Sequence, residues 1–200
     1  MFLPTALIDR EFIDYAKTML RQTVLGSAEI ETQNTAKTQR NTYNFGYNYR
    51  RLQKGDRSQT PIPGFLFNLC QKALCGLKRS AGIKLPDASL YTNCIVSVYG
   101  PGFKLQPHID VNQELATKRG MDFYFDDNII GVVLQADRHG SLYLQDHHGK
   151  SWPVREENGT AFLLSGPTRH CPHGVNEVAV ERLSATFRIV HLTVSREGPG

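Results

Sequence analysis

The chain has 200 residues, of which 40% are hydrophobic and 21% charged, and lysine and arginine outnumber aspartate and glutamate by 23 to 19. This composition suits a globular chain long enough to bury a core, and it excludes collagen-like, low-complexity and highly charged disordered chains. The mild positive charge permits a polyanionic partner without requiring one. No apolar run approaches the roughly 20 residues of a membrane span, and the four cysteines form no CxxC pair. We therefore expect an intracellular protein, cytoplasmic or nuclear, with reduced thiols and no membrane association.

The first part of the chain predicts two helices. Residues 9–22 and 64–79 both repeat apolar side chains at the three- and four-residue spacing of an amphipathic helix. Pro63 precedes the second helix, and Gly82 follows its basic last turn, as the ends of helices favour. Residues 27–60, between the two helices, are polar and rich in Asn, Gln and Thr, so we expect this stretch to be partly irregular.

After Pro86 the periodicity changes to that of strands. Short runs rich in β-branched and aromatic residues alternate with turns that contain Gly, Pro, Asn or Asp. These runs are residues 91–99, 103–110, 128–136, 140–146, 150–155, 159–166, 173–178 and 182–194. About eight short strands predict a mainly β fold, a sandwich or a jelly roll, which forms one compact unit with the N-terminal helices. Residues 114–128 follow no pattern that assigns them to an element.

One of these predicted strands contains the sequence His108-Ile109-Asp110. Because side chains at i and i+2 of a strand point to the same face, the imidazole and the carboxylate are offered to one point. Far downstream, His173 follows a turn-like segment. Two histidines and one carboxylate are typical of non-haem Fe(II) sites, where they leave positions for a bidentate cosubstrate and O₂. Zinc accepts the same residues, and a surface histidine near a surface aspartate gives the same short motif, so the pattern alone leaves both alternatives open.

Residues 182–188 predict a strand with two different faces. Alternation places apolar side chains on one face and, on the other, Arg182, Ser184, Thr186 and Arg188. If the polar face looks into the fold, the two guanidinium groups need anions, and a small dianion could reach both. The alternative is that both arginines lie on a solvent-exposed face.

Together these motifs resemble the AlkB-like family of Fe(II)- and 2-oxoglutarate-dependent dioxygenases. The segments that carry the resemblance most closely are NCIVSVYGPGFKLQPHID (93–110), SGPTRHCPHGV (165–175) and RLSATFR (182–188). Two further segments carry it more loosely, NFGYNY (44–49) and PIPGFLFNLCQKA (61–73). The resemblance implies a double-stranded β-helix (jelly roll) as the catalytic core at residues 90–195. It also implies an N-terminal helical extension and a nucleotide-recognition lid at residues 1–89.

The resemblance also implies the metal and cosubstrate residues. The implied iron ligands are His108, Asp110 and His173. The spacing in the matching turn selects His173 over His170. The residues implied to hold 2-oxoglutarate are Tyr99, Arg182 and Arg188. By the resemblance, Arg182 binds the distal carboxylate of 2-oxoglutarate, and Arg188 lies beside the carboxylate nearer the metal. The implied cofactors are Fe(II), the cosubstrate 2-oxoglutarate and O₂.

Residues 40–54 combine aromatic and basic side chains. The rings of this segment alternate and would share one strand face, at Tyr43, Phe45, Tyr47 and Tyr49. Because rings stack on bases and cations bind phosphates, the segment is a candidate substrate lid. The residues expected to contact the substrate are Tyr47, Tyr49, Arg50 and Arg51. The alternative is a half-buried hairpin whose rings pack on the core.

The function implied by the resemblance is oxidative demethylation of N-alkylated bases in DNA or RNA, in DNA repair or RNA demethylation. Single-stranded nucleic acid is the expected partner, and the protein is expected to be a monomer. Two departures keep other substrates open. Ser97 stands where the repair members commonly carry Asn, and Val111-Asn112-Gln113 follows Asp110 where they often carry acidic residues. The alternatives are a hydroxylase of a modified tRNA base, a protein side chain or a small molecule, and a non-catalytic binding module.

Overall fold

The computed structural model describes residues 3–23, 31–35, 38–137 and 140–193, with residues 31–35 and 38 as backbone alone. Both predicted helices are confirmed, as α1 (Arg10–Thr23) and α3 (Gly64–Ala81). Their apolar faces are buried, and the basic residues of the last turn of α3 are Lys78 and Arg79. None of the described helices qualifies as a membrane span.

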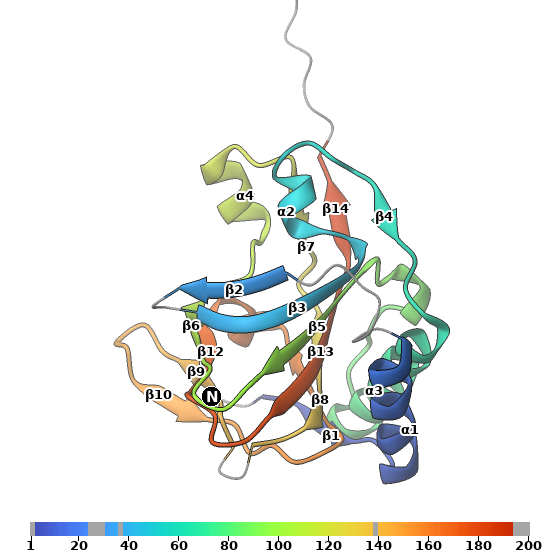
Figure 1. The fold of residues 1–200 in the computed structure, drawn as a ribbon. Helices are drawn as coiled ribbons and strands as arrows, with labels where there is room; N and C mark the ends of the chain where they lie inside the picture. The colour runs from blue at the N-terminus through green and yellow to red at the C-terminus, as the bar shows by residue number, and fades with distance from the viewer. Residues whose placement is uncertain (1–2, 24–30, 36–37, 138–139, 194–200) are drawn as a thin grey trace, which may run out of the picture.

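The described strands form one large antiparallel sheet and one small two-stranded sheet (Figure 1). The large sheet runs in the order β1 (Thr5–Leu7), β11 (Thr160–Leu164), β8 (Ile129–Gln135), β13 (Arg182–Arg188), β5 (Asn93–Tyr99), β3 (Thr38–Tyr47), β6 (Leu105–His108), β12 (His173–Val175), β9 (Leu142–Gln145) and β10 (Ser151–Pro153). Two more strands add to β3, namely β2 (Glu31–Thr35) and β4 (Gln59–Thr60). The small sheet pairs β14 (Val190–Leu192) with β7 (Phe123–Phe125). This mainly β architecture with N-terminal helices confirms the predicted jelly-roll fold.

The helices cover one face of the large sheet. α3 packs on β1, β11 and β8, and α1 packs on α3 and β8 (Figure 1). The buried side chains between these layers form the larger apolar core, which includes Leu20, Leu69, Val132 and Phe187. Strands from the N-terminal part also enter the sheet, because β1 pairs with β11 and β3 pairs with β5. The first 89 residues and the later strands therefore share one sheet and one core.

The two faces of β13 differ as the alternation predicts. Its apolar side chains belong to the core under the helices, at Leu183, Ala185 and Phe187. The opposite face lines a cavity inside the barrel with Arg182, Ser184, Thr186 and Arg188. Because Arg182 is 2% and Arg188 7% exposed, the alternative of a solvent-exposed arginine face is wrong.

Two stretches of the later chain differ from the sequence-based expectation. The unassigned segment 114–128 contains most of α4 (Gln113–Arg119) and all of β7. The single strand expected at 182–194 divides into β13 and β14, because the backbone changes partners at Ile189. There the carbonyl of Ile189 accepts a hydrogen bond from the backbone of Asp126, and β14 continues along β7 instead of β5.

The aromatic segment at 40–54 folds differently from one alternating strand. β3 ends at Tyr47, and Tyr49 begins the short helix α2 (Tyr49–Leu52). Tyr43 and Phe45 are buried in the core, as the hairpin alternative proposes. Gly46 has a positive φ of 70°, and a Cβ there would overlap the backbone carbonyl of Thr92. The kink at this glycine ends the alternation, so the four rings do not share one face.

We expect Gly46→Ala to destabilise the fold by more than the roughly 1–3 kcal/mol that a strained positive φ alone costs. The extra loss comes from the collision with the Thr92 carbonyl. Gly55→Ala is the matched control, because Gly55 has a similar φ of 76° and open space around its Cα. Urea unfolding of both variants measures the difference, and equal losses would contradict the steric argument.

Candidate metal centre and adjoining cavities

Two distant strands place the predicted histidines face to face. In the antiparallel pairing of β12 with β6, His173 lies directly opposite His108, and the two ring centres are 4.5 Å apart. Asp110 follows just beyond β6, with its Oδ1 3.8 Å from His108 Nε2. One possible donor atom from each of the three residues lies within 4.8 Å of the others. These three side chains could therefore bind one metal ion.

Gly174 makes this register possible. A Cβ at this position would lie 2.5 Å from the carbonyl oxygen of Leu105 and 2.6 Å from the hydroxyl of Tyr143. The Leu105 carbonyl is part of the backbone of β6, the strand that pairs with β12. Any residue larger than glycine would therefore push β12 away from β6. The glycine next to His173 therefore keeps that histidine against His108.

Burial favours the neutral form of both imidazoles. It lowers the pKa of His108, and it lowers the pKa of His173 to about 4, with His108 adding to the second effect. Burial alone would raise the pKa of Asp110, but the Arg188 guanidinium and the two imidazoles hold it well below its usual value. Near neutral pH the centre therefore offers two imidazole lone pairs and one carboxylate, the protonation states that metal binding requires.

Arg188 orients the carboxylate of Asp110. Its Nε donates to Oδ2 at 3.0 Å, which leaves Oδ1 on the side of His108. Its guanidinium also lies over the ring of Phe125, 5.2 Å from the ring centre. The anion next to Arg188 is thus a side chain of the protein itself, which reasoning from β13 alone could not identify.

Arg169 fixes the backbone around the centre. It is 1% exposed and lies in a short 3₁₀ helix, Gly166–His170, four residues before His173. Its guanidinium donates to the carbonyl oxygens of Asp110 at 2.9 Å and Val111 at 3.2 Å, and to those of Phe125 and Asp126, both at 3.2 Å. One side chain therefore ties the turn before His173 to the segment that carries Asp110.

Arg182 also has a buried partner within the chain. Glu156 accepts from its Nε at 3.2 Å and from its Nη2 at 2.9 Å. The same carboxylate accepts from the backbone and hydroxyl of Ser141 and from the backbone of Leu142. Arg182 Nη1 donates to Ser184 Oγ at 3.0 Å within the barrel cavity. Glu156 thus holds one edge of the guanidinium and leaves its Nη1 end on the cavity side.

The cavity inside the barrel, here called the inner cavity, is lined by the polar face of β13, by both histidines and by Tyr99. Arg182 lies beside the Tyr99 ring, with its guanidinium carbon 5.6 Å from the ring centre. Arg40, from β3, donates to the Tyr99 hydroxyl and to Ser97 Oγ, both at 3.4 Å. The three predicted cosubstrate residues Tyr99, Arg182 and Arg188 therefore line one cavity, which also includes Arg40.

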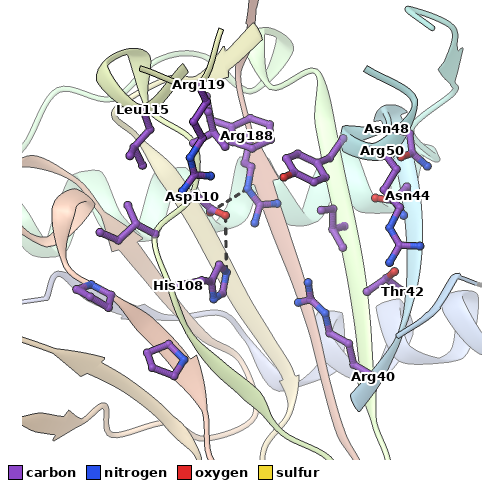
Figure 2. A pocket seen from close by; sticks show the side chains of 17 residues that line it. Arg40, Thr42, Asn44, Asn48, Arg50, His108, Asp110, Leu115, Arg119 and Arg188 are labelled. Atoms are coloured by element: carbon purple, nitrogen blue, oxygen red, sulfur yellow. Dashed lines mark hydrogen bonds and ion pairs between the residues drawn. The ribbon is translucent and has the colours of Figure 1, made fainter. Parts of the chain in front are cut away.

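A second cavity of about 600 Å³, here called the outer cavity, is lined by His108 and Asp110 and shares Arg40, His108 and Arg188 with the inner cavity. Figure 2 shows Leu115 and Arg119 entering it from α4, opposite a wall of side chains from β3 and α2. The labelled residues of that wall are Arg40, Thr42, Asn44, Asn48 and Arg50. His108, Asp110 and Arg188 lie between the two walls. A molecule in this cavity would therefore lie next to the candidate metal ligands.

The predicted substrate residues divide between two positions. Tyr49 and Arg50 line the outer cavity, whereas Tyr47 and Arg51 are not among its lining residues. Tyr47 packs against the second apolar core, and Arg51 donates to Ser58 Oγ at 3.2 Å. The cavity wall of β3 is instead its polar face, which includes Thr42 and Asn44 and lies opposite the buried Tyr43 and Phe45.

Asn112 has a structural role at the start of α4. Its side-chain oxygen accepts from the backbone of Leu115 at 2.8 Å, which caps the helix, and its amide lies 3.2 Å from the His170 ring. It does not line the outer cavity. Compared with an acidic residue at this position, Asn112 therefore places no negative charge near the candidate metal ligands and still caps the helix.

Sequence reasoning missed Glu156, the structural role of Arg169, and Arg119. A buried partner for Arg182 was to be expected on charge grounds, but nothing in the sequence singles out Glu156 among the acidic residues. Arg169 lies in the turn that carries the family resemblance, and that motif was a usable signal. Arg119 lies in the segment that had no assignment.

No family model and no curated protein matches the chain. Solved structures with the same fold include the structure of OsALKBH1, with 18% identity, a TM-score of 0.64, and coverage of 94% of this chain and 99% of that chain. A prolyl-4-hydroxylase from Pseudomonas putida is similar at 16% identity and a TM-score of 0.55, over 95% of this chain and 92% of that chain. An oxidoreductase of the 2OG-Fe(II) oxygenase family from Burkholderia pseudomallei is similar at 13% identity and a TM-score of 0.60, over 97% and 89%. These likenesses establish the fold.

We expect His173→Ala to weaken binding of a divalent metal ion at least about 100-fold, because the loss of a ligand exceeds the 10- to 100-fold cost of losing a residue that only supports one. His170→Ala is the matched control from the same turn, because His170 is exposed and outside the candidate centre. Titration of the purified chain with Fe(II) under anaerobic conditions measures both affinities. Equal binding by His173→Ala and the unaltered protein would refute the ligand set.

We expect Glu156→Gln to destabilise the protein at pH 7 by about 3–5 kcal/mol, because it leaves the buried Arg182 without a countercharge. Burial alone would raise the pKa of Glu156, but Arg182 holds it below its usual value of 4.5. A carboxylate with a lowered pKa stabilises the folded state above its unfolded pKa, and this stability is lost as the pH falls.

The difference between the two proteins should therefore shrink below about pH 4.5. Urea midpoints measured from pH 7 to pH 3 test this expectation. The double variant Glu156→Gln/Arg182→Met removes both charges and should recover much of the lost stability. A difference that does not change with pH would contradict the ion pair as its source.

Proposed function

We propose that the protein is an Fe(II)- and 2-oxoglutarate-dependent dioxygenase that demethylates N-alkylated bases in single-stranded DNA or RNA. The observation that carries the proposal is the position of His108, Asp110 and His173 between two cavities. The inner cavity suits a small dicarboxylate, because Arg182, Arg188 and Tyr99 line it. The outer cavity suits a planar substrate, because Tyr49 and Phe125 line it with arginines around them.

The donor set fits a metal of this class. Two neutral imidazoles and one carboxylate are the ligands of the facial triad, and they leave positions for a cosubstrate and O₂. With Fe(II) bound, one O₂ and one 2-oxoglutarate would yield succinate, CO₂ and a hydroxylated substrate carbon. The ketoacid and the C–H bond each supply two electrons. A hydroxymethyl group on nitrogen then loses formaldehyde, and the nitrogen regains a proton.

The chain's own residues bind and orient the reactants. The Nη1 end of Arg182, the Tyr99 hydroxyl and Arg40 are donors for the distal carboxylate of the cosubstrate. Arg188 and Arg169 hold Asp110 in the orientation that a ligand needs. The walls from α4 and from β3 with α2 enclose the substrate and limit the access of water to the centre.

The second candidate is hydroxylation of an amino-acid side chain or a small molecule by the same chemistry. It is favoured by the likeness to the prolyl-4-hydroxylase, which extends over 95% of this chain. It differs from the first candidate in the product, because hydroxylation at a carbon not attached to nitrogen releases no formaldehyde.

The full chain with Fe(II), ascorbate and 2-oxoglutarate should release formaldehyde and succinate in equal amounts from single-stranded oligonucleotides that carry N-methylated bases. His173→Ala and Arg182→Ala should reduce both products at least about 100-fold, a loss of about 2.7 kcal/mol in transition-state stabilisation. Mass spectrometry of the nucleic acid locates the lost methyl group. Succinate formation with a proline peptide, without turnover of any methylated DNA or RNA, would favour the second candidate.

A further inference from the structure

The charges around the outer cavity favour one class of base. Among the described residues that line it, the charged side chains are Arg40, Arg50, Arg119, Arg188 and Asp110. The single carboxylate in this set, Asp110, is already paired with Arg188 and belongs to the candidate metal centre. The described lining therefore offers no carboxylate that is available to a cationic substrate.

Arg119 contributes a positive charge on the α4 side. It is exposed, lines the outer cavity, and forms no ion pair with the rest of the described chain. On the opposite wall, Arg40 and Arg50 line the same cavity. A cationic base held between the two walls would be repelled by arginines on both sides.

The aromatic lining does not compensate for this repulsion. A cation can be attracted to the face of an aromatic ring, but the guanidinium of Arg188 already lies over Phe125 at 5.2 Å. Tyr49 lies close to the same ring, with the two ring centres 6.4 Å apart and their planes 31° apart. Phe125 thus already has a cation at its face, and Asp110 is the one carboxylate among the described lining residues.

The polar groups of the lining match a base that presents oxygen atoms. Arginine donates hydrogen bonds and cannot accept them, whereas Asn44, on the wall opposite α4, can do both. A neutral base with ring carbonyl oxygens offers acceptors to these donors. A cationic base with an exocyclic amino group presents a donor that the arginines cannot accept.

We propose that the outer cavity selects neutral N-methylated bases with carbonyl oxygens over cationic N-methylated bases. The inference rests on the proposed nucleic-acid function and specifies its substrate class. Arg119 contributes to this selectivity by repelling a charged base.

Two bases separate charge from methyl position. 3-Methyluracil is neutral and 3-methylcytosine is a cation at neutral pH, and both carry the methyl group on the same ring nitrogen. In otherwise identical single-stranded RNA, we expect kcat/KM to be at least about tenfold higher for 3-methyluracil, the effect of one unit charge several ångströms away at an intermediate dielectric. Formaldehyde release and mass spectrometry of the product measure both rates.

The Arg119→Glu variant should shift this ratio towards 3-methylcytosine by about tenfold or more, because it reverses the charge at the cavity wall. Lys118→Glu is the matched control, since Lys118 is the preceding residue of α4 and does not line the cavity. Both variants make the same change in net charge and affect RNA phosphates similarly, so Lys118→Glu should leave the ratio unchanged. Fluorescence anisotropy measures the dissociation constants of the two RNAs for the metal-free protein. Arg119→Glu should shift the ratio of these constants towards tighter binding of the 3-methylcytosine RNA.

The outcomes are distinct. A preference for 3-methylcytosine, equal rates, or a ratio that Arg119→Glu does not alter would overturn this inference and leave the demethylase function intact. If no methylated nucleic acid is turned over although a peptide or small molecule is hydroxylated, the proposed function fails and this inference fails with it.

Discussion

The register between β6 and β12 is the constraint on which the candidate metal centre depends. A shift of one residue would turn His173 to the opposite face of its strand, away from His108. Two features hold the register. Gly174 allows close approach to the backbone of β6, and β12 also pairs with β9 on its other edge, where His173 lies opposite Leu144. Because both edges of β12 are paired, the histidine position is set by the sheet and does not depend on a loop.

Asp110 needs a separate constraint, because it lies beyond the end of β6. The carbonyl oxygens of Asp110 and Val111 are held by Arg169, which reaches them from the turn that leads into β12. The chain therefore couples two ligands through one buried guanidinium. Arg188 completes the arrangement from β13 by binding the carboxylate itself. Three ligand positions are thus set by strand register, backbone anchoring and an ion pair, and none of these requires a bound metal.

Burying a guanidinium is costly unless its charge is balanced and its donors are hydrogen-bonded. The fold meets this requirement differently for each of three buried arginines. Arg169 is matched by carbonyl dipoles, Arg188 by the ligand Asp110, and Arg182 by Glu156. The two arginines implied to bind the cosubstrate are therefore stabilised before any dicarboxylate arrives. The cosubstrate would use the remaining donors of guanidinium groups that are already oriented, which lowers the ordering cost of its binding.

The sequence predicted the elements whose pattern is local. Both helices, the short strands and the inward polar face of β13 follow from periodicity, and His108 and Asp110 follow from spacing within one segment. Pairing across the sheet is not local, so the choice of Glu156 for Arg182 could not be read from the chain. The alternation from Tyr43 to Tyr49 was misleading for a different reason. It assumes continuous strand geometry, which Gly46 and the onset of α2 interrupt.

The interruption of the alternation also decides which side chains of β3 face the outer cavity. In β3 the aromatic side chains fill the core, and the polar ones between them face the outer cavity, so the strand contributes Thr42 and Asn44 to the wall opposite α4. On the other side, Asn112 caps α4 and thereby sets the helix whose last residue, Arg119, lines the cavity. A carboxylate at position 112 could still cap the helix, but it would place a negative charge close to the metal ligands. With asparagine there, the described cavity has arginines and neutral amides around a single, already paired carboxylate. The proposed selection by charge would then depend on the same residues that form the cavity walls.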